Sequence, residues 1–156
     1  MENILNQLPT IKKRSLLIVE DSDADFEAVK RSLKKIGFNH SIYRVTDGEE
    51  ALDFIFHSGE YQNQEVAPKP TLIMLDLNLP GTDGREVLAT IKEDESTRQI
   101  PVIVFSTSAN PQDIEICYKW GANSYLLKAM DINKLQESLQ VSIRYWFEVV
   151  ALPSEF

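Results

Sequence analysis

Short apolar runs recur along the chain, and each ends where turn-forming or polar residues begin. Residues 15–19, 72–75 and 102–105 are almost wholly aliphatic or aromatic. Runs of this length, bounded by turn signals, are typical of strands buried on both faces of a parallel sheet. Residues 123–127 form a further candidate, and the more polar SIYRV at 41–45 suits a sheet edge. The pattern therefore predicts five strands.

Between these strands, apolar residues recur at three- and four-residue intervals, which is typical of helices that cover a sheet. Ser22 is a suitable N-cap for the first helix, with Asp25 where a capping box places an acid, and Gly37 is suited to end it. The predicted inner face of the first helix consists of Phe26, Val29, Leu33 and Ile36, and that of the second of Ala51, Leu52, Ile55 and Phe56. For the third helix it consists of Val87, Leu88 and Ile91. For the last helix it consists of Ile132, Leu135, Leu139, Ile143, Trp146 and Val150.

Capping and helix-terminating residues indicate where the later helices begin and end. The second helix is expected over residues 48–58 and the third over 85–95. Pro111 suits the first turn of a fourth helix, because proline there lacks only an N–H that has no helical partner. That helix is expected to end near 120–121, and Asp131 can cap the last helix.

Five strands alternating with five helices predict an α/β fold around a parallel sheet, because parallel strands need crossover connections. We expect one domain over residues 15–150, after a loosely held lead-in at 1–14 and before a short tail at 151–156. No internal repeat or low-complexity tract divides the sequence. The residues outside the domain are too few for an output domain.

Composition narrows the class of protein further. The 156 residues carry a net charge of −8, which argues against a nucleic-acid-binding face and against attraction to an anionic membrane. No apolar run approaches the roughly 20 residues that span a bilayer. The single cysteine, Cys117, excludes an intrachain disulfide and is expected to pack within a helix. We therefore expect a cytoplasmic domain that binds neither nucleic acid nor membrane.

Reactive side chains stand at the carboxyl ends of four predicted strands: Glu20 and Asp21, Asp76, Ser106 and Lys128. Because chemistry in parallel sheets collects at the carboxyl ends of strands, we expect these groups to share one pocket. Three crowded carboxylates repel one another and need a cation. A ligand set made only of oxygen favours Mg²⁺ over zinc.

Within this pocket Asp76 is the candidate nucleophile for a phosphoryl group. Mg²⁺, with Mn²⁺ or Ca²⁺ as substitutes, and Lys128 would offset the charge on the phosphoryl oxygens, while Ser106 would donate a hydrogen bond to one of them. The predicted metal ligands are Glu20, Asp21, Asp76 and the backbone carbonyl of Asn78. Each feature is weak evidence alone, but the ordered set is strong.

These features together resemble the response-regulator receiver domain. The motifs that carry the resemblance are the acid pair after the first strand, LDLNLPGTDG around Asp76, Ser106, and GANSYLLK ending in Lys128. The match runs from Leu16 to Leu139, without gaps between the site residues. It implies a flavodoxin-like (CheY-like) doubly wound sheet with strand order 2-1-3-4-5 and an extended last helix. It also implies phosphotransfer from a sensor histidine kinase to Asp76.

The resemblance further implies a relay from the site to the surface. Ser106 would move toward the phosphorylated Asp76, and Tyr125 would turn inward; a fixed, half-buried Tyr125 is the equal alternative. The surface of the fourth helix, fifth strand and fifth helix would then change. The protein would catalyse its own phosphotransfer and dephosphorylation, and would signal through protein contacts as a single-domain response regulator rather than as an enzyme.

Two segments resemble, more narrowly, the stand-alone response regulators of cyanobacterial and other bacterial phytochromes. They are the polar loop at 59–70 and the ending WFEVVALP at 146–153. This resemblance implies that the kinase is a phytochrome, which is a red-light photoreceptor.

The sequence departs from the family pattern at three positions. Glu20 stands where many relatives have aspartate, Ser106 replaces the commoner threonine, and Ala129 follows Lys128 where proline is usual. A cis bond without proline costs roughly 3–4 kcal/mol. We therefore expect either a trans Lys128–Ala129 bond with a rearranged loop or a cis bond held by the site.

Tyr145, Trp146 and Phe147 are three consecutive aromatic residues in the last predicted helix. On a helix they point in three directions, so at least one is left for another surface. We expect a homodimer in which this helix meets its mate, together with the fourth helix and fifth strand. The alternative is a helix end that packs only on its own domain.

Two other functions fit parts of the same pattern. A phosphatase of the haloacid dehalogenase kind also uses a Mg²⁺-bound aspartate, but its second acid is Asn78 here and its motif follows the first strand rather than the third. A receiver-like interaction module that is never phosphorylated is the other alternative, and the complete set of site residues argues against it. His40 and His57 lack ligand spacing, and we expect both at the surface.

Overall fold

The computed structural model describes residues 14–128 and 131–153. The elements are β1 (Ser15–Val19), α1 (Asp23–Lys35), β2 (Ser41–Val45), α2 (Gly48–Phe56), the 3₁₀ helix η2 (Gly59–Tyr61), β3 (Leu72–Leu75), α3 (Gly84–Glu93), β4 (Val102–Ser106), α4 (Pro111–Lys119), β5 (Ser124–Leu127), α5 (Ile132–Arg144) and the π-helical continuation η3 (Tyr145–Val149). Nearly all of the predicted lead-in, and the Lys128–Ala129 junction, lie outside the described residues.

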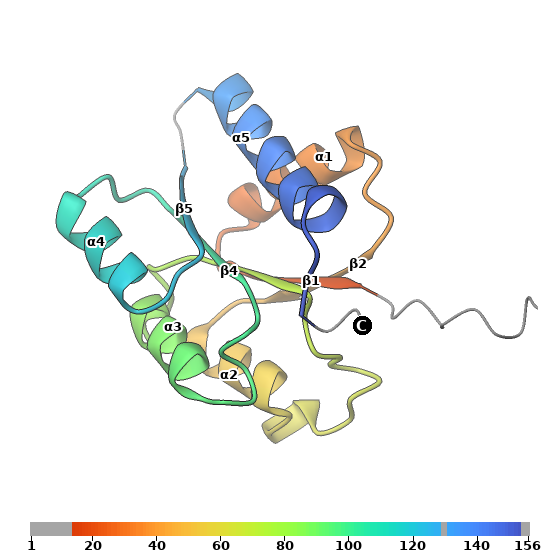
Figure 1. Cartoon of the computed structure of the whole chain (residues 1–156), viewed down its shortest axis with the longest axis vertical. Helices are drawn as coiled ribbons and strands as arrows, with labels where there is room; N and C mark the ends of the chain where they lie inside the picture. Colours follow the sequence, from red (N-terminus) through yellow and green to blue (C-terminus); the bar gives the residue numbers. More distant parts are fainter. Residues whose placement is uncertain (1–13, 129–130, 154–156) are drawn as a thin grey trace, which may run out of the picture.

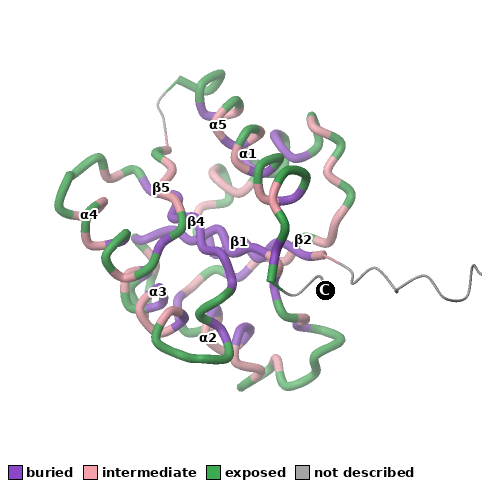
Figure 2. The backbone as a smooth tube through the Cα atoms, in the orientation of Figure 1, coloured by how far each residue is buried: buried purple, intermediate pink, exposed green. Residues whose placement is uncertain are grey.

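The five strands form one parallel sheet in the order β2-β1-β3-β4-β5, which confirms the flavodoxin-like topology (Figure 1). Helices α1 and α5 cover one face, and α2, α3 and α4 cover the other. Successive side chains of β1 alternate between the two layers: Leu17 and Val19 pack toward α2 and α3, and Leu16 and Ile18 toward α1 and α5. Burial is therefore concentrated at the sheet (Figure 2).

Local sequence signals set the boundaries of α1. The Ser22 hydroxyl accepts a hydrogen bond from the backbone N–H of Asp25 (3.2 Å), as predicted for an N-cap. At the other end Gly37 takes a left-handed conformation (φ 69°), and the N–H groups of Gly37 and Phe38 donate back to carbonyls of the last turn. This is a Schellman motif, which glycine favours because it has no Cβ.

Helix α2 ends earlier than predicted. It stops at Phe56, and His57 adopts a left-handed conformation (φ 56°) with its Nε2 atom 2.7 Å from the Ala67 carbonyl oxygen. His57 is thus partly buried and contacts the 59–70 loop through Ala67. Phe54, which the predicted inner face omitted, is buried, whereas Leu52 is only partly buried.

The inner stripe of the last helix also differs from the prediction. It consists of Leu135, Leu139, Ile143 and Phe147, whereas Ile132 is 54% exposed. These buried residues are four positions apart, and the spacing extends to Phe147 because its ring packs edge-on against Phe38 (centroids 4.9 Å apart) and beside His40 (5.2 Å). Phe147 is therefore unavailable to a partner, which corrects its expected place at the dimer surface. His40 is partly buried beside it.

Leu152, just beyond η3, packs back onto the domain. Residue 152 belongs to the predicted tail, yet its side chain is buried. The domain boundary at residue 150 stays a prediction. Cys117 is fully buried in α4, as expected, and burial raises the pKa of its thiol. Among the described residues, no helix combines the length and apolar character needed to cross a membrane.

Candidate functional site

The carboxyl ends of the strands bring the predicted site residues to one edge of the sheet. Hydrogen bonds of the sheet continue past the strands: the Asp76 N–H donates to the Val19 carbonyl (3.0 Å), and the Lys128 N–H donates to the Ser106 carbonyl (2.8 Å). Asp76 therefore stands beside Glu20, which directly follows Val19. The pocket could be predicted because the carboxyl ends of parallel strands lie at the same edge of a sheet.

Three carboxylates lie together in this pocket. Glu20, Asp21 and Asp76 each offer an oxygen, and these oxygens all lie within 4.8 Å of one another. Glu20 and Asp76 are buried, whereas Asp21 is exposed. Burial raises the pKa of Glu20 to about 7, although Lys128 acts in the opposite direction. Crowded, desolvated carboxylates that offer only oxygen fit a hard divalent cation, so the donor set supports a divalent-metal site here.

Lys128 is placed among these acids. Its Nζ atom lies 2.6 Å from Glu20 Oε1, 2.9 Å from Asp25 Oδ2 and 3.3 Å from Asp76 Oδ2. It also lies over the Phe105 ring, 5.1 Å from the centroid. Burial acts to lower the pKa of Lys128, but the hydrogen bonds to Glu20 and Asp25 outweigh it and raise the pKa, so the ammonium stays charged.

Asp25 is a site residue that sequence reasoning missed, because the prediction used it only as a capping acid. Its carboxylate binds Lys128 instead of closing the capping box, and the Ser22 N–H donates to Glu20 Oε2 (3.3 Å). The available signal was its position in the first turn of the helix that directly follows the acid pair, at the carboxyl end of the first strand.

Arg44 from the edge strand β2 supports the acid pair and was not anticipated either. Its Nε donates to the backbone carbonyl of Glu20 (3.0 Å), and its Nη1 pairs with Asp23 (2.8 Å). The guanidinium also stacks over Phe26, 4.5 Å from the ring centroid. These contacts fix the chain direction where β1 leads into α1.

The loop after β3 is held by two close backbone approaches. A Cβ at Gly84 would lie 2.2 Å from the Asp76 carbonyl oxygen, and one at Gly48 would lie 2.0 Å from the Thr82 carbonyl oxygen. The loop is thus clamped between the first turns of α2 and α3, where only glycine fits. Within it, the Asn78 N–H donates to Asp76 Oδ1 (3.3 Å). The role of the Asn78 carbonyl as a metal ligand stays a prediction.

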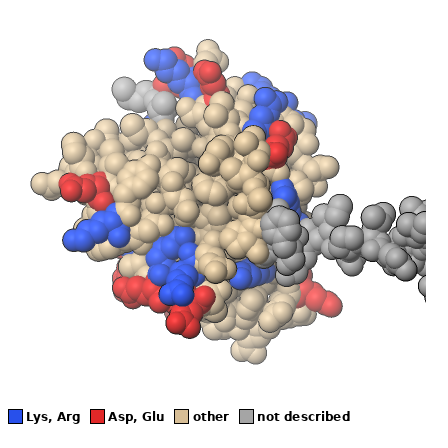
Figure 3. Space-filling view, viewed as in Figure 1, with Lys and Arg blue, Asp and Glu red and all other residues tan. Residues whose placement is uncertain are grey.

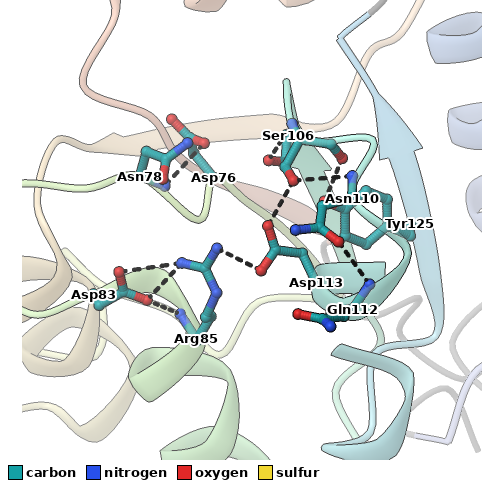
Figure 4. A network of polar contacts seen from close by, with 10 residues as sticks. Asp76, Asn78, Asp83, Arg85, Ser106, Asn110, Gln112, Asp113 and Tyr125 are labelled. Atoms are coloured by element: carbon teal, nitrogen blue, oxygen red, sulfur yellow. Dashed lines mark hydrogen bonds and ion pairs between the residues drawn. The ribbon is translucent and has the colours of Figure 1, made fainter. Parts of the chain in front are cut away.

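Ser106 and Tyr125 both bind the loop between β4 and α4. The buried Ser106 hydroxyl accepts a hydrogen bond from the Ser108 N–H (3.1 Å), and the Tyr125 hydroxyl donates to the Ser108 carbonyl (2.8 Å). Figure 4 shows this loop across the site from Asp76. Tyr125 is partly buried in the core beside α4, so both alternatives for it, switching or fixed, remain predictions.

Comparisons with known proteins agree with this geometry. The response regulator Rcp1 of Synechocystis sp. is 42% identical over 139 residues, covering 89% of this chain and 92% of that protein. The crystal structure of the Mn²⁺-bound form of Rcp1 matches with a TM-score of 0.84 at 41% identity, covering 90% of this chain and 99% of the other. The phosphorylated cyanobacterial phytochrome response regulator RcpA matches with the same TM-score and coverage at 39% identity.

The family profile described as "Response regulator receiver domain" matches residues 16–140, a range that includes the carboxyl ends of all five strands. The match contains the acid pair, Asp76, Ser106 and Lys128. The chain therefore belongs to the response regulator receiver-domain family.

Proposed function

We propose that the protein is phosphorylated on Asp76 in the presence of Mg²⁺ by a sensor histidine kinase. As a receiver domain it is a phosphoacceptor rather than a classical enzyme. The single observation that carries the proposal is the placement of the buried Asp76 carboxylate. It lies within 4.8 Å of the other two acids and 3.3 Å from Lys128 Nζ.

The roles of the residues follow from this placement. An Asp76 carboxylate oxygen attacks phosphorus and forms the acyl phosphate, while the bond from phosphorus to the donor nitrogen breaks. Lys128 neutralises a phosphoryl oxygen, and the Ser106 hydroxyl donates a hydrogen bond to another. Asp21, Asp76 and the Asn78 carbonyl would hold Mg²⁺ directly, with Glu20 beside them. The bound cation supplies further positive charge for the phosphoryl oxygens, and the same groups would support autodephosphorylation.

A phytochrome is the proposed kinase. The support comes from relatives: RcpA is a cyanobacterial phytochrome response regulator at 39% identity, and a response regulator in red light signaling of R. palustris is 31% identical with a TM-score of 0.83. Both matches cover 90% of this chain and 99% of the other. We place this signalling in the cytoplasm.

Incubation with Mg²⁺ and acetyl phosphate tests the central proposal. The intact chain should gain the mass of one phosphoryl group, peptide mapping should place it on Asp76, and a chelator should prevent the gain. Phosphotransfer from candidate histidine kinases, including a phytochrome in both light states, then tests the donor. Labelling at another residue would contradict the proposal. No labelling from any donor would favour the unphosphorylated interaction module, and repeated turnover of phosphomonoesters would favour a phosphatase.

A homodimer is the second part of the proposal, and exposed apolar residues support it. Val141, Tyr145 and Val149 are 63%, 48% and 70% exposed and follow one another at four-residue steps along α5 and η3. Trp146 is partly buried against its own core. Figure 3 shows a broad face over α4, β5 and α5 whose charged side chains lie at the rim, although the chain carries a net charge of −8. Such a face suits a second copy.

Sedimentation at micromolar concentration, with and without phosphorylation, tests the dimer. The unsubstituted protein should sediment as a dimer in at least one state, and Tyr145→Glu should give a monomer because it places a charge in the apolar stripe. Val66→Glu is the matched control, since Val66 is 54% exposed in the distant 59–70 loop. A monomer in both states of the unsubstituted protein would contradict this part of the proposal.

A further inference from the structure

An ionic bridge joins the two helices that flank the site. Arg85, in the first turn of α3, places Nη1 3.2 Å from Asp83 Oδ1 and Nη2 3.1 Å from Asp113 Oδ1 (Figure 4). Asp83 is the N-cap of α3, and Asp113 lies in the first turn of α4. Because α3 follows the loop that begins at Asp76, the bridge ties the phosphoacceptor loop to the helix on the opposite side.

The bridge continues from Asp113 to the buried hydroxyl of Ser106. Asp113 Oδ2 accepts a hydrogen bond from the Ser108 hydroxyl (2.6 Å), and the Ser108 backbone N–H donates to Ser106 Oγ (3.1 Å). A serine oxygen that accepts a hydrogen bond still carries its own proton. The contact with Ser108 therefore fixes the Ser106 oxygen and leaves its O–H able to donate.

We propose that Arg85, acting through Asp113 and Ser108, positions the Ser106 hydroxyl to donate a hydrogen bond to the phosphoryl group on Asp76. The inference rests on the proposed function, which supplies that phosphoryl group. Arg85 and Asp113 are positioning residues, because they act on the site through Ser108 rather than by contact with Asp76.

The chemistry of the bridge suits this role. Residues 107, 109 and 110 of the β4–α4 loop are exposed, so burial does little to hold the loop in place. Hydrogen bonds that involve ionised partners are shorter and stronger than neutral ones. The Ser108 hydroxyl and then Arg85 lower the pKa of Asp113, which keeps its carboxylate ionised and able to accept. The bridge thus holds the side chain of Ser108, in addition to the hydrogen bond from Tyr125 that holds its backbone carbonyl.

The affinity of the full chain for beryllofluoride with Mg²⁺, which mimics a phosphoryl group on a carboxylate, tests the inference. Arg85→Met and Ser108→Ala should each weaken it roughly three- to tenfold, the loss expected for one oriented hydrogen bond. Arg85→Lys, which keeps the cation, should restore most of the affinity. Lys30→Met is the matched control, because it removes a surface cation 3.8 Å from Glu27 on the remote face of α1.

A double-mutant cycle shows whether the effect passes through Ser106. In a Ser106→Ala background, Arg85→Met should cause no further loss of beryllofluoride affinity. In the metal-free protein, hydrogen exchange at the Ser108 amide should be faster in Arg85→Met than in Lys30→Met. If Arg85→Met does not fold, Asp113→Asn carries the same test, because it removes the charge and keeps an acceptor for Ser108.

Three results would overturn the inference: unchanged affinity in the Arg85 and Ser108 variants, an equal loss in the Ser106→Ala background, or a gain in affinity. A gain would mean that the bridge restrains a resting loop instead of positioning a donor. Failure of the proposed function looks different, because the unsubstituted protein would then bind no beryllofluoride in the presence of Mg²⁺.

Discussion

Asp76→Asn is expected to abolish phosphorylation and, in the metal-free protein, to raise the free energy of unfolding. The neutral amide cannot act as the nucleophile, so no label should be acquired from acetyl phosphate or from a kinase. The gain in stability follows from the carboxylates, whose oxygens lie within 4.8 Å of one another in a largely buried pocket. Removing one of three like charges should stabilise the fold by about 1 kcal/mol, while Lys128 keeps Glu20 and Asp25 as partners.

Urea unfolding in chelator and in Mg²⁺ measures both parts of this result. Mg²⁺ should shift the midpoint of the unsubstituted protein to higher urea and should have much less effect on Asp76→Asn, which lacks one ligand. Glu86→Gln, an exposed position on α3, is the control for the loss of a negative charge. If Asp76→Asn were less stable than the unsubstituted protein in chelator, the pairing of Asp76 with Lys128 would outweigh the repulsion that we infer.

Gly84→Ala is expected to cost about 3 kcal/mol or more in the free energy of unfolding, because overpacking against backbone cannot be relieved by a rotamer change. The new Cβ would lie 2.2 Å from the carbonyl oxygen of Asp76 and 2.6 Å from the Cα of Leu77. Relief requires the Asp76 loop to move away from α3. Any folded Gly84→Ala protein should therefore also be phosphorylated more slowly.

Gly81→Ala is the matched control, in the same loop. Gly81 has a φ of 72°, but a Cβ added there would meet no atom of the described residues within 4 Å, so alanine enters open space. Its cost should be about 1 kcal/mol, that of the left-handed backbone alone, and the rate of phosphorylation should be unchanged. Equal losses at the two positions, measured by urea unfolding, would show that contact with Asp76 is not what selects glycine at 84.

The sheet and the edge that carries the site could be predicted because both follow from short-range patterns. Apolar runs identify strands, and parallel strands necessarily end at one edge, so Asp76 and Lys128 could be placed together from the sequence. The alternation of β1 between two layers follows equally from the two-residue period of a strand. The strand order itself came from the resemblance to receiver domains.

The features that were missed depend on contacts between distant elements. The spacing of apolar residues permits either Trp146 or Phe147 on the inner stripe, and the choice is made by Phe38 near the end of α1. The binding of Asp25 to Lys128 joins residues 103 positions apart. The bridge from Arg85 to Asp113 likewise requires the mutual placement of two helices, which no local pattern specifies.

The position of Lys128 among the acids has a consequence for how the site meets its cation. The Lys128 ammonium already neutralises part of the carboxylate charge, so we expect the domain to fold without a metal ion. Small zinc domains, by contrast, fold only when their metal is bound. One positive charge against the four acidic side chains of Glu20, Asp21, Asp25 and Asp76 still leaves the pocket negatively charged and therefore attractive to a dication. We therefore expect the domain to fold without Mg²⁺ and to bind the ion reversibly, so that the Mg²⁺ concentration sets how much of the folded protein is ready to be phosphorylated.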